Sequence, residues 1–190
     1  MAVPDRVLTN VELTTMVDTS EEWILQRTGI AERRIAGEGE TTFTLSLQAA
    51  FKALDVADLD PARLDLIIVA TVTPDYAFPS TACLMQDALG AEDAAAFDLS
   101  AGCSGFVYGM SFAADLLKSG RYQTALVIGA ETLSRITDYT DRATCILFGD
   151  GAGAVVLEAR DAPGGVLSTE LGADGSGGDM LFLPGGGSVN

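Results

Sequence analysis

The chain has 190 residues, of which 48% are hydrophobic and 20% are charged, a composition typical of one compact globular domain and not of a disordered segment. Its 27 acidic and 11 basic residues give a formal net charge of −16, which disfavours nucleic acid as a partner because phosphate binding needs a basic surface. Histidine is absent and the cysteines, Cys83, Cys103 and Cys145, lack paired short spacing, so the sequence favours neither a metal site nor a disulfide framework.

The apolar runs of the sequence are too short to span a bilayer. The run TALVIGA at 124–130 is far below the roughly 20 residues that a membrane helix needs. The start MAVPDRVLTN has no apolar core of the kind found in signal peptides. We therefore expect no membrane partner and a cytoplasmic location for the chain.

The sequence of the first part of the chain predicts helices. Residues 7–41 hold two short helical stretches separated by DTS at 18–20. In TSEE, which follows Asp18, a hydroxyl can cap the second stretch by accepting a backbone N–H of its first turn. From Thr42 onward, apolar residues recur at helical spacing and predict an amphipathic helix that ends near Asp55.

The remainder alternates strands and helices. Strands are predicted at 64–72, 94–100, 124–132, 146–160 and 164–174. A helix follows FPS at 78–80, and another runs from Cys103 to about 118. Because strand and helix alternate, the early strands should pair in parallel through right-handed crossovers. We expect an α/β fold with a mixed, mostly parallel five-stranded sheet and helices on both faces.

Cys103 lies at the predicted junction between a strand and a helix. The positive end of a helix dipole and the unpaired N–H groups there favour a thiolate, and hence a nucleophile. The neighbouring Gly102, Ser104 and Gly105 are small enough to let a substrate approach the backbone. The alternative is ordinary packing, since free cysteine is often buried, as we expect for Cys83 and Cys145. A cysteine nucleophile also usually works beside a histidine, which this chain lacks.

Two other motifs are interpreted as structural. GDGAGA at 149–154 does not match G-x-G-x-x-G and lacks the P-loop lysine, so its glycines indicate a close approach of backbones. GCSG at 102–105 lacks the glycine spacing of G-x-S-x-G. Asp98 and Asp150, at strand ends, are expected to cap loops and to take no part in catalysis.

Several long motifs, taken in order, resemble the N-terminal half of the β-ketoacyl-acyl-carrier-protein synthase III family of the thiolase superfamily. They are VLTN at 7–10, DTSEEWILQRTGIAERRIA at 18–36, FPSTACLMQDALG at 78–90, FDLSAGCSGF at 97–106, DRATCILFGDGAGAVVL at 141–157 and LGADGSG at 171–177. The resemblance implies that residues 1–190 form one half of a thiolase-like fold, with the C-terminal half absent from this chain.

The resemblance also implies roles for coenzyme A binding. Cys103 matches the family's nucleophile, which takes the acyl group. Trp23 and Arg142 match the pair that sandwiches the adenine of coenzyme A, and Arg27 and Thr28 match residues near its phosphate and pantetheine. An indole and a guanidinium both stack on a base, and the arginines supply local positive charge. Without the family, a half-buried core aromatic is the alternative reading of Trp23.

For the acyl group, the resemblance points to Phe78, Leu133 and Phe148 as the residues around the pocket. Phe78 would be supplied across the interface of a homodimer. Ordinary core packing remains the alternative for all three residues.

The activity implied by the resemblance is an acyltransferase reaction. It condenses a short acyl-CoA with malonyl-acyl-carrier protein by decarboxylative Claisen chemistry and starts fatty acid synthesis, using coenzyme A thioester as substrate and no cofactor. The alternatives are a related ketosynthase of secondary metabolism, a hydroxymethylglutaryl-CoA synthase, or an inactive half or non-catalytic assembly subunit.

The sequence departs from the family in two respects. The short strand that normally precedes VPDRVLTN is reduced to Met1 and Ala2, so one sheet edge is expected to be unpaired. The family's catalytic His and Asn, and a Gly of its oxyanion hole, fall in the half that these residues do not include. A fragment, one of two assembling polypeptides and an inactive relic are all compatible with that absence.

Overall fold

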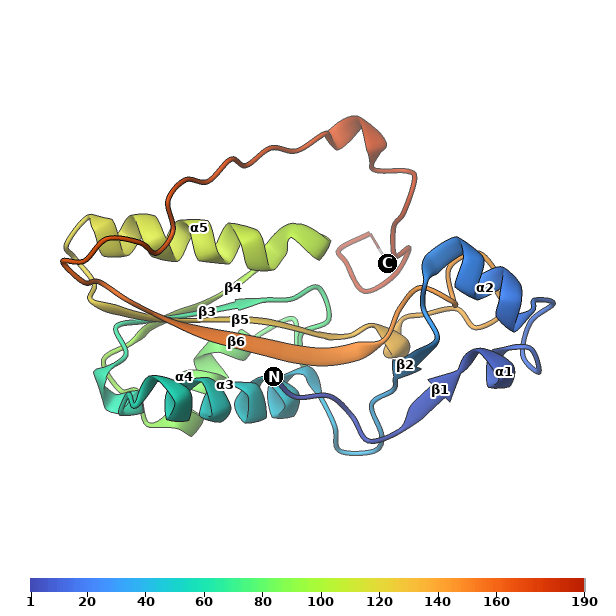
Figure 1. Cartoon of the computed structure of the whole chain (residues 1–190), viewed down its shortest axis with the longest axis horizontal. Coiled ribbons are helices and arrows are strands. Elements are labelled where there is room, and N and C mark those ends of the chain that lie inside the picture. Colours follow the sequence, from blue (N-terminus) through green and yellow to red (C-terminus); the bar gives the residue numbers. More distant parts are fainter. Residues whose placement is uncertain (190) are drawn as a thin grey trace.

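A four-stranded sheet with helices on both faces forms the body of the protein. The computed structural model describes residues 1–189. Helix α5 (Gly105–Lys118) covers one face of the sheet, and α3 (Thr42–Ala57) and α4 (Thr81–Leu89) cover the other (Figure 1). The predicted α/β architecture with two helical layers is therefore confirmed.

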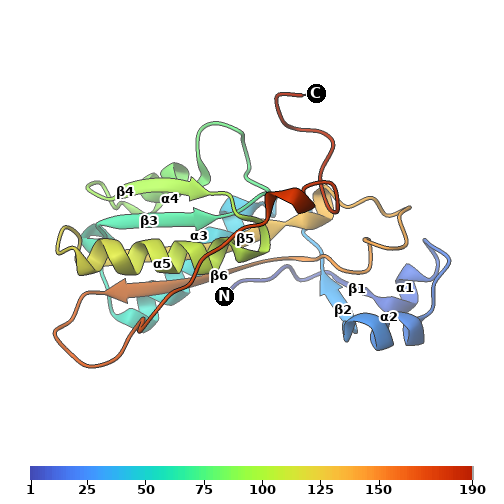
Figure 2. The same cartoon turned by 90° about the horizontal axis from the view of Figure 1, so that it is seen from above.

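The strands follow the order β4-β3-β5-β6, as the view from above shows (Figure 2). The strands are β3 (Leu66–Ala70), β4 (Ala95–Leu99), β5 (Thr124–Thr132) and β6 (Asp150–Glu158). Strand β3 pairs in parallel with β4 and β5, whereas β6 runs antiparallel to β5. All residues of β3 are buried, as expected for a central strand of a parallel sheet.

The prediction of a fifth strand at 164–174 is wrong. Gly164 and Gly165 take φ values of 115° and 83°, which turn the chain away from the sheet edge after β6. The chain then runs along the outside of α5 (Figure 1), where Tyr108 Oη donates to the carbonyl of Gly172 at 2.8 Å. The described part of the main sheet consequently has four strands.

The free edge of β6 is not left unpaired at its start. Ala2 and Ala152 exchange two backbone hydrogen bonds, each of 2.8 Å. The two residues before Val3 thus supply a single bridge where a short strand was expected to be missing.

A small lobe precedes the sheet and lies at one end of it (Figure 1). Its strands β1 (Val7–Thr9) and β2 (Glu32–Arg34) pair antiparallel, and α1 (Asn10–Leu13) and α2 (Glu21–Thr28) lie between them in the chain. Ser20 caps α2 by accepting the N–H of Trp23 at 3.2 Å, which confirms the predicted cap. The two short strands were not expected, since three residues are too few to show a period.

The buried Arg33 joins this lobe to the loop before β6. Its guanidinium donates to Asn10 Oδ1 at 2.9 Å and to the carbonyls of Leu8 and Ile146 at 3.2 and 3.1 Å. Burial lowers the pKa of Arg33 from its ordinary value. Gly149 makes this packing possible, because a Cβ there would lie 2.9 Å from Arg33 Cβ.

Short 3₁₀ turns complete the fold. They are η1 (Pro61–Arg63), η2 (Gly102–Ser104), η3 (Leu133–Arg135) and η4 (Gly175–Gly177). Within residues 1–189, none of the helices has the length and apolar character needed to cross a membrane.

Candidate active site

Cys103 lies at the junction between β4 and α5, as the sequence predicts. Strand β4 ends at Leu99, Cys103 is the middle residue of η2, and α5 begins two residues later, with the thiol residue exposed. Gly102 has a φ of 53°, a left-handed conformation that favours glycine. A Cβ on Gly105 would lie 3.1 Å from Ala70 Cβ, so this glycine lets α5 begin directly against the end of β3.

The amino end of α5 faces the site. Ser104, the N-cap residue, makes no side-chain cap hydrogen bond to the first turn. The carboxyl ends of the parallel strands β3 and β5 meet at the same edge, where ligands of α/β proteins usually bind. Cys103 therefore combines exposure with the positive end of a 14-residue helix.

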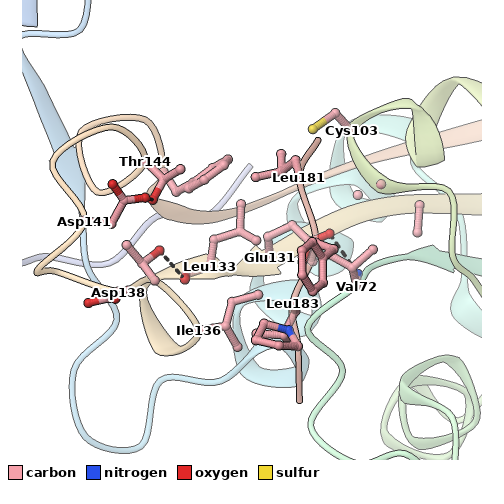
Figure 3. Close-up of a pocket in the computed structure, with 18 of the residues that line it drawn as sticks. Val72, Cys103, Glu131, Leu133, Ile136, Asp138, Asp141, Thr144, Leu181 and Leu183 are labelled. Carbon is pink, nitrogen blue, oxygen red and sulfur yellow. Dashed lines mark hydrogen bonds between the residues drawn. The ribbon is translucent and has the colours of Figure 1, made fainter. Parts of the chain in front are cut away.

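A cavity of about 670 Å³ opens beside the thiol (Figure 3). Its volume is in the range of small-molecule sites, and its wall is mainly apolar. Phe106, Leu133, Ile136 and Phe148 contribute to that wall, and the late segment Leu181–Pro184 crosses it. Such a lining suits a hydrocarbon chain better than a sugar or a phosphate.

Two aspartates give the cavity a negative rim. Asp138 accepts Thr140 Oγ1 at 2.7 Å and its N–H at 2.8 Å, and these bonds hold the pKa of Asp138 below its ordinary value. Asp141 accepts Thr144 Oγ1 at 2.5 Å and the N–H of Ala143 at 2.9 Å, which likewise lowers its pKa. Both side chains line the cavity as carboxylates at neutral pH.

These aspartates do not make a metal site. Across residues 1–189, no group of three or more His, Cys, Asp or Glu side chains is arranged to hold a metal ion.

Trp23, Arg27 and Arg142 come together at the small lobe. The Arg142 guanidinium lies 4.5 Å from the centroid of the Trp23 ring, and that of Arg27 lies 5.6 Å from it. Trp23 also packs against the apolar core of the lobe, so it is both half-buried and stacked. Arg142 directly follows Asp141 of the cavity rim, so the loop after η3 contributes both to the cavity and to the cluster around Trp23.

Thr28 ends α2. Its Oγ1 donates to the carbonyl of Ile24 at 2.8 Å and accepts the N–H of Ile30 at 3.0 Å. Gly29 then closes the helix with a φ of 70°. Thr28 thus fixes the turn that follows Arg27.

Phe78 stands apart from the cavity. It lies in the segment of residues 71–80 between β3 and α4, which we call the aromatic loop, and it is 89% exposed. Leu133 and Phe148 do line the cavity with Cys103. The structure therefore brings together two of the three residues expected around the acyl group.

The expectation that Cys83 is buried is wrong. Cys83 is exposed although its Sγ lies 3.7 Å from the carbonyl oxygen of Ala96 on β4, whereas Cys145 is buried as expected. Burial raises the pKa of the Cys145 thiol. Cys83 contacts β4, which is an outer strand of the sheet, so its side chain remains exposed. The local sequence does not show this, because the neighbouring Ala82 and Leu84 are both apolar.

The sequence did not single out Glu131, Asp138, Asp141 or the segment Leu181–Pro184 as parts of the site. Glu131 lies one residue before the end of the strand predicted at 124–132, at the carboxyl edge of a parallel sheet, which is a usable signal. The sequence of Leu181–Pro184 has no feature that predicts a place in the site, because this segment reaches the cavity from far along the chain.

Comparison with known proteins finds close relatives. A model of the 3-oxoacyl-[acyl-carrier-protein (ACP)] synthase III family matches residues 97–175. The beta-ketoacyl-[acyl-carrier-protein] synthase III of Caldanaerobacter subterraneus subsp. tengcongensis is 56% identical over 98% of this chain and 56% of its own length. That of Xylella fastidiosa (strain Temecula1) is 58% identical over 98% of this chain and 57% of its own length.

Solved structures are similar as well. The 3-oxoacyl-(acyl carrier protein) synthase III of Pseudomonas aeruginosa PAO1 matches with a TM-score of 0.91 at 43% identity, over 99% of this chain and 59% of that one. The beta-ketoacyl-ACP synthase III of Thermus thermophilus matches with a TM-score of 0.90 at 46% identity, over 95% of this chain and 56% of that one. The chain thus spans somewhat more than half the length of these relatives.

Proposed function

Because this chain belongs to the β-ketoacyl-acyl-carrier-protein synthase III family and has its thiolase-like fold, we propose that it is an acyltransferase of fatty acid initiation. Cys103 would take a short acyl group from acyl-CoA, and the acyl-enzyme would then condense with malonyl-acyl-carrier protein. The observation that carries the proposal is the position of Cys103, exposed at the start of α5 and open to an apolar cavity.

The first half-reaction needs a thiolate and a place for the acyl chain. The Cys103 sulfur attacks the thioester carbonyl, the carbon–sulfur bond to coenzyme A breaks, and coenzyme A leaves with a proton. Leu133 and Phe148, which line the cavity with Cys103, would contact the acyl group. Backbone N–H groups at the start of α5 are available to the oxyanion that forms during the attack.

Trp23 and Arg142 would hold the adenine of coenzyme A, with Arg27 and Thr28 near its phosphate and pantetheine. A base between two planes needs two stacking distances of about 3.5 Å each. The present separation of 4.5 Å therefore requires Arg142 to move outward before a base can enter. Arg142 is exposed on a loop, which makes that movement inexpensive.

The second half-reaction needs more than these residues. Loss of CO₂ from malonyl-acyl-carrier protein leaves a carbanion, which attacks the acyl carbon while the bond to Cys103 breaks. Hydrogen-bond donors must stabilise the thioester enolate, and the family uses His and Asn for this. The chain contains no histidine, so we propose that this donor comes from residues outside these 190.

We propose a homodimer in the cytoplasm as the working form. Strand β4 is an outer strand of the sheet, with Phe97 39% exposed, and an outer strand offers unpaired backbone groups to another chain. The aromatic loop precedes α4, which packs on β4. A partner bound at this edge would receive Phe78 into its own acyl pocket.

Acylation by acetyl-CoA tests the proposal. The intact mass of the chain should increase by one acetyl group, and fragmentation should locate that group on Cys103. Cys103→Ser should abolish the adduct. Cys83→Ser is the matched control, because Cys83 is exposed but lies outside the cavity, and it should leave the adduct unchanged.

Acetylation that persists in Cys103→Ser, or that requires Cys83, would overturn the assignment. It would favour the reading of an inactive half or assembly subunit. Efficient acylation by long or branched acyl-CoA in preference to acetyl-CoA would instead favour a ketosynthase of secondary metabolism.

A further inference from the structure

Glu131 is a carboxylate of the cavity wall that the proposed mechanism does not use. It lies near the end of β5 and forms no ion pair with any residue between 1 and 189. Its Oε1 accepts the N–H of Val72 at 2.9 Å (Figure 3). Its Oε2 accepts Thr71 Oγ1 at 3.3 Å and also accepts Thr73 Oγ1. All three donors belong to the base of the aromatic loop.

The hydrogen bonds around Glu131 have a fixed direction. Thr71 Oγ1 already accepts the N–H of Thr73 at 3.1 Å, and Thr73 Oγ1 accepts the N–H of Thr132 at 2.9 Å. Each hydroxyl proton is thus free to point at Glu131. The carboxylate is surrounded by donors alone, and only an acceptor-only side chain satisfies them all.

The base of the aromatic loop is also fixed to α3. Thr42 Oγ1 donates to the carbonyl of Thr73 at 2.6 Å, and the N–H of Phe43 donates to Asp75 Oδ1 at 2.8 Å. Beyond these anchors the loop projects Phe78, which is 89% exposed. The loop is therefore held at its base and presents an aromatic tip to its surroundings.

We propose that Glu131 is a positioning residue that sets acyl-chain selectivity through the aromatic loop. By fixing the base of the loop it fixes the direction of Phe78, and Phe78 limits the depth of the partner protomer's acyl pocket. The same carboxylate lines the cavity of its own protomer, so it connects the two cavities of the dimer. This inference rests on the proposed function, which supplies both the acyl-enzyme and the dimer.

The test compares the rates at which acetyl-CoA and hexanoyl-CoA acylate Cys103, followed by intact mass. Glu131→Gln keeps the size of the side chain but sets an NH₂ group against donors. We expect it to shift the ratio of the two rates toward hexanoyl-CoA by about tenfold, the scale on which an apolar pocket discriminates chain length. Phe78→Ala should shift the ratio in the same direction, and the double variant should shift it no further than the larger single change.

Asp65→Asn is the matched control. Asp65 accepts the N–H groups of Gln123 and Thr124 at 2.7 and 3.0 Å, before β3 and far from the cavity along the sheet. It should lower the melting temperature without changing the rate ratio. Thr71→Val removes one donor to Glu131 and should shift the rate ratio less than Glu131→Gln does. It replaces Glu131→Gln in the test if the latter does not fold.

The outcomes separate the two claims. A parent chain that is acylated by neither thioester overturns both the proposed function and this inference. If the parent is acylated and both Glu131→Gln and Thr71→Val keep the parent's ratio of acylation rates, this inference alone is overturned. Additive effects of Glu131→Gln and Phe78→Ala would also overturn it, since the two residues would then act independently.

Discussion

Trp23 is the residue proposed to stack on the adenine of coenzyme A, and its ring is already held in place. The ring packs on the lobe core and carries the Arg142 guanidinium at 4.5 Å. We expect Trp23→Ala to weaken coenzyme A binding by roughly 1–3 kcal/mol, the scale of one lost base–aromatic stack. Titration calorimetry would measure this, with Trp23→Phe as a control that keeps a smaller ring. Equal affinities of Trp23→Ala and the parent would exclude the stack.

The three thiols should differ toward alkylation, for separate reasons. Cys145 is buried and burial raises its pKa, so iodoacetamide at neutral pH should not modify it in the folded chain. Cys83 and Cys103 are both exposed, so accessibility does not separate them. We expect Cys103 to react faster because it lies at the start of a helix. Peptide mapping over time measures the order, and faster modification of Cys83 would contradict it.

Cys145 also makes stability depend on alkaline pH. Its folded-state pKa lies above the ordinary value of 9.0, so the folded chain holds this proton more tightly than the unfolded chain does. The resulting stabilisation is complete below about pH 9 and is lost as the pH rises through the folded value. The melting temperature should therefore fall above pH 9, and less steeply in Cys145→Ala. Cys83→Ala, the exposed control, should keep the parent's slope.

Among single residues, the position of Cys103 was predictable, whereas the hydrogen-bond partners of Glu131 were not. A cysteine between a strand and a helix is visible in a short stretch of sequence. The donors to Glu131 lie 58–60 residues away in the chain, on a neighbouring parallel strand's loop. Such contacts depend on the pairing of β3 with β5, which a local pattern does not specify.

At the scale of elements, the glycines of GDGAGA should differ from one another. A Cβ on Gly149 would lie 2.9 Å from Arg33 Cβ and 3.2 Å from the carbonyl oxygen of Arg34, whereas one on Gly153 would meet nothing within 4 Å. Gly149→Ala should cost about 1–3 kcal/mol of unfolding free energy, as overpacking does. Gly153→Ala should cost little or nothing. Denaturant unfolding of the pair measures the difference, and equal losses would contradict the close approach.

Elements with strong periodicity were predicted well, and those set by long-range packing were not. The apolar run of β3 is sufficient to predict a buried strand, and the helical spacing of apolar residues in α3 is sufficient to predict a helix. The segment VLSTEL at 166–171 was interpreted as part of a strand, but the backbone turns away from the sheet at Gly164 and Gly165. Strands β1 and β2 are held by the lobe core, which combines Leu8 with residues as distant as Ile146.

At the scale of the whole molecule, the net charge of −16 is largely uncompensated. Within residues 1–189 the ion pairs join Arg6 to Glu12, Arg63 and Arg160 to Glu158, and Lys118 to Asp115, and all are at least partly exposed. Such pairs contribute little, so repulsion between the remaining carboxylates destabilises the compact state.

Salt should therefore stabilise the protein. Raising NaCl from about 0.01 M to about 0.15 M shortens the screening length from about 30 Å to about 8 Å. We expect the melting temperature to rise over this range, and an uncharged solute at equal osmolality should not reproduce the whole increase. A melting temperature that falls with NaCl would show that attractive pairs dominate.

The proposed function is tested most directly by supplying the chain with acetyl-CoA and malonyl-acyl-carrier protein together and measuring the masses of the chain and of the carrier protein. We predict an acetyl group on Cys103 and no 3-ketoacyl-carrier protein, since the chain contains the proposed nucleophile but no histidine to stabilise the enolate. Adding a polypeptide that carries the family's His and Asn should then release the product. Robust formation of 3-ketoacyl-carrier protein by the 190 residues alone would contradict the proposed division of roles, as would the absence of any acetyl group on Cys103.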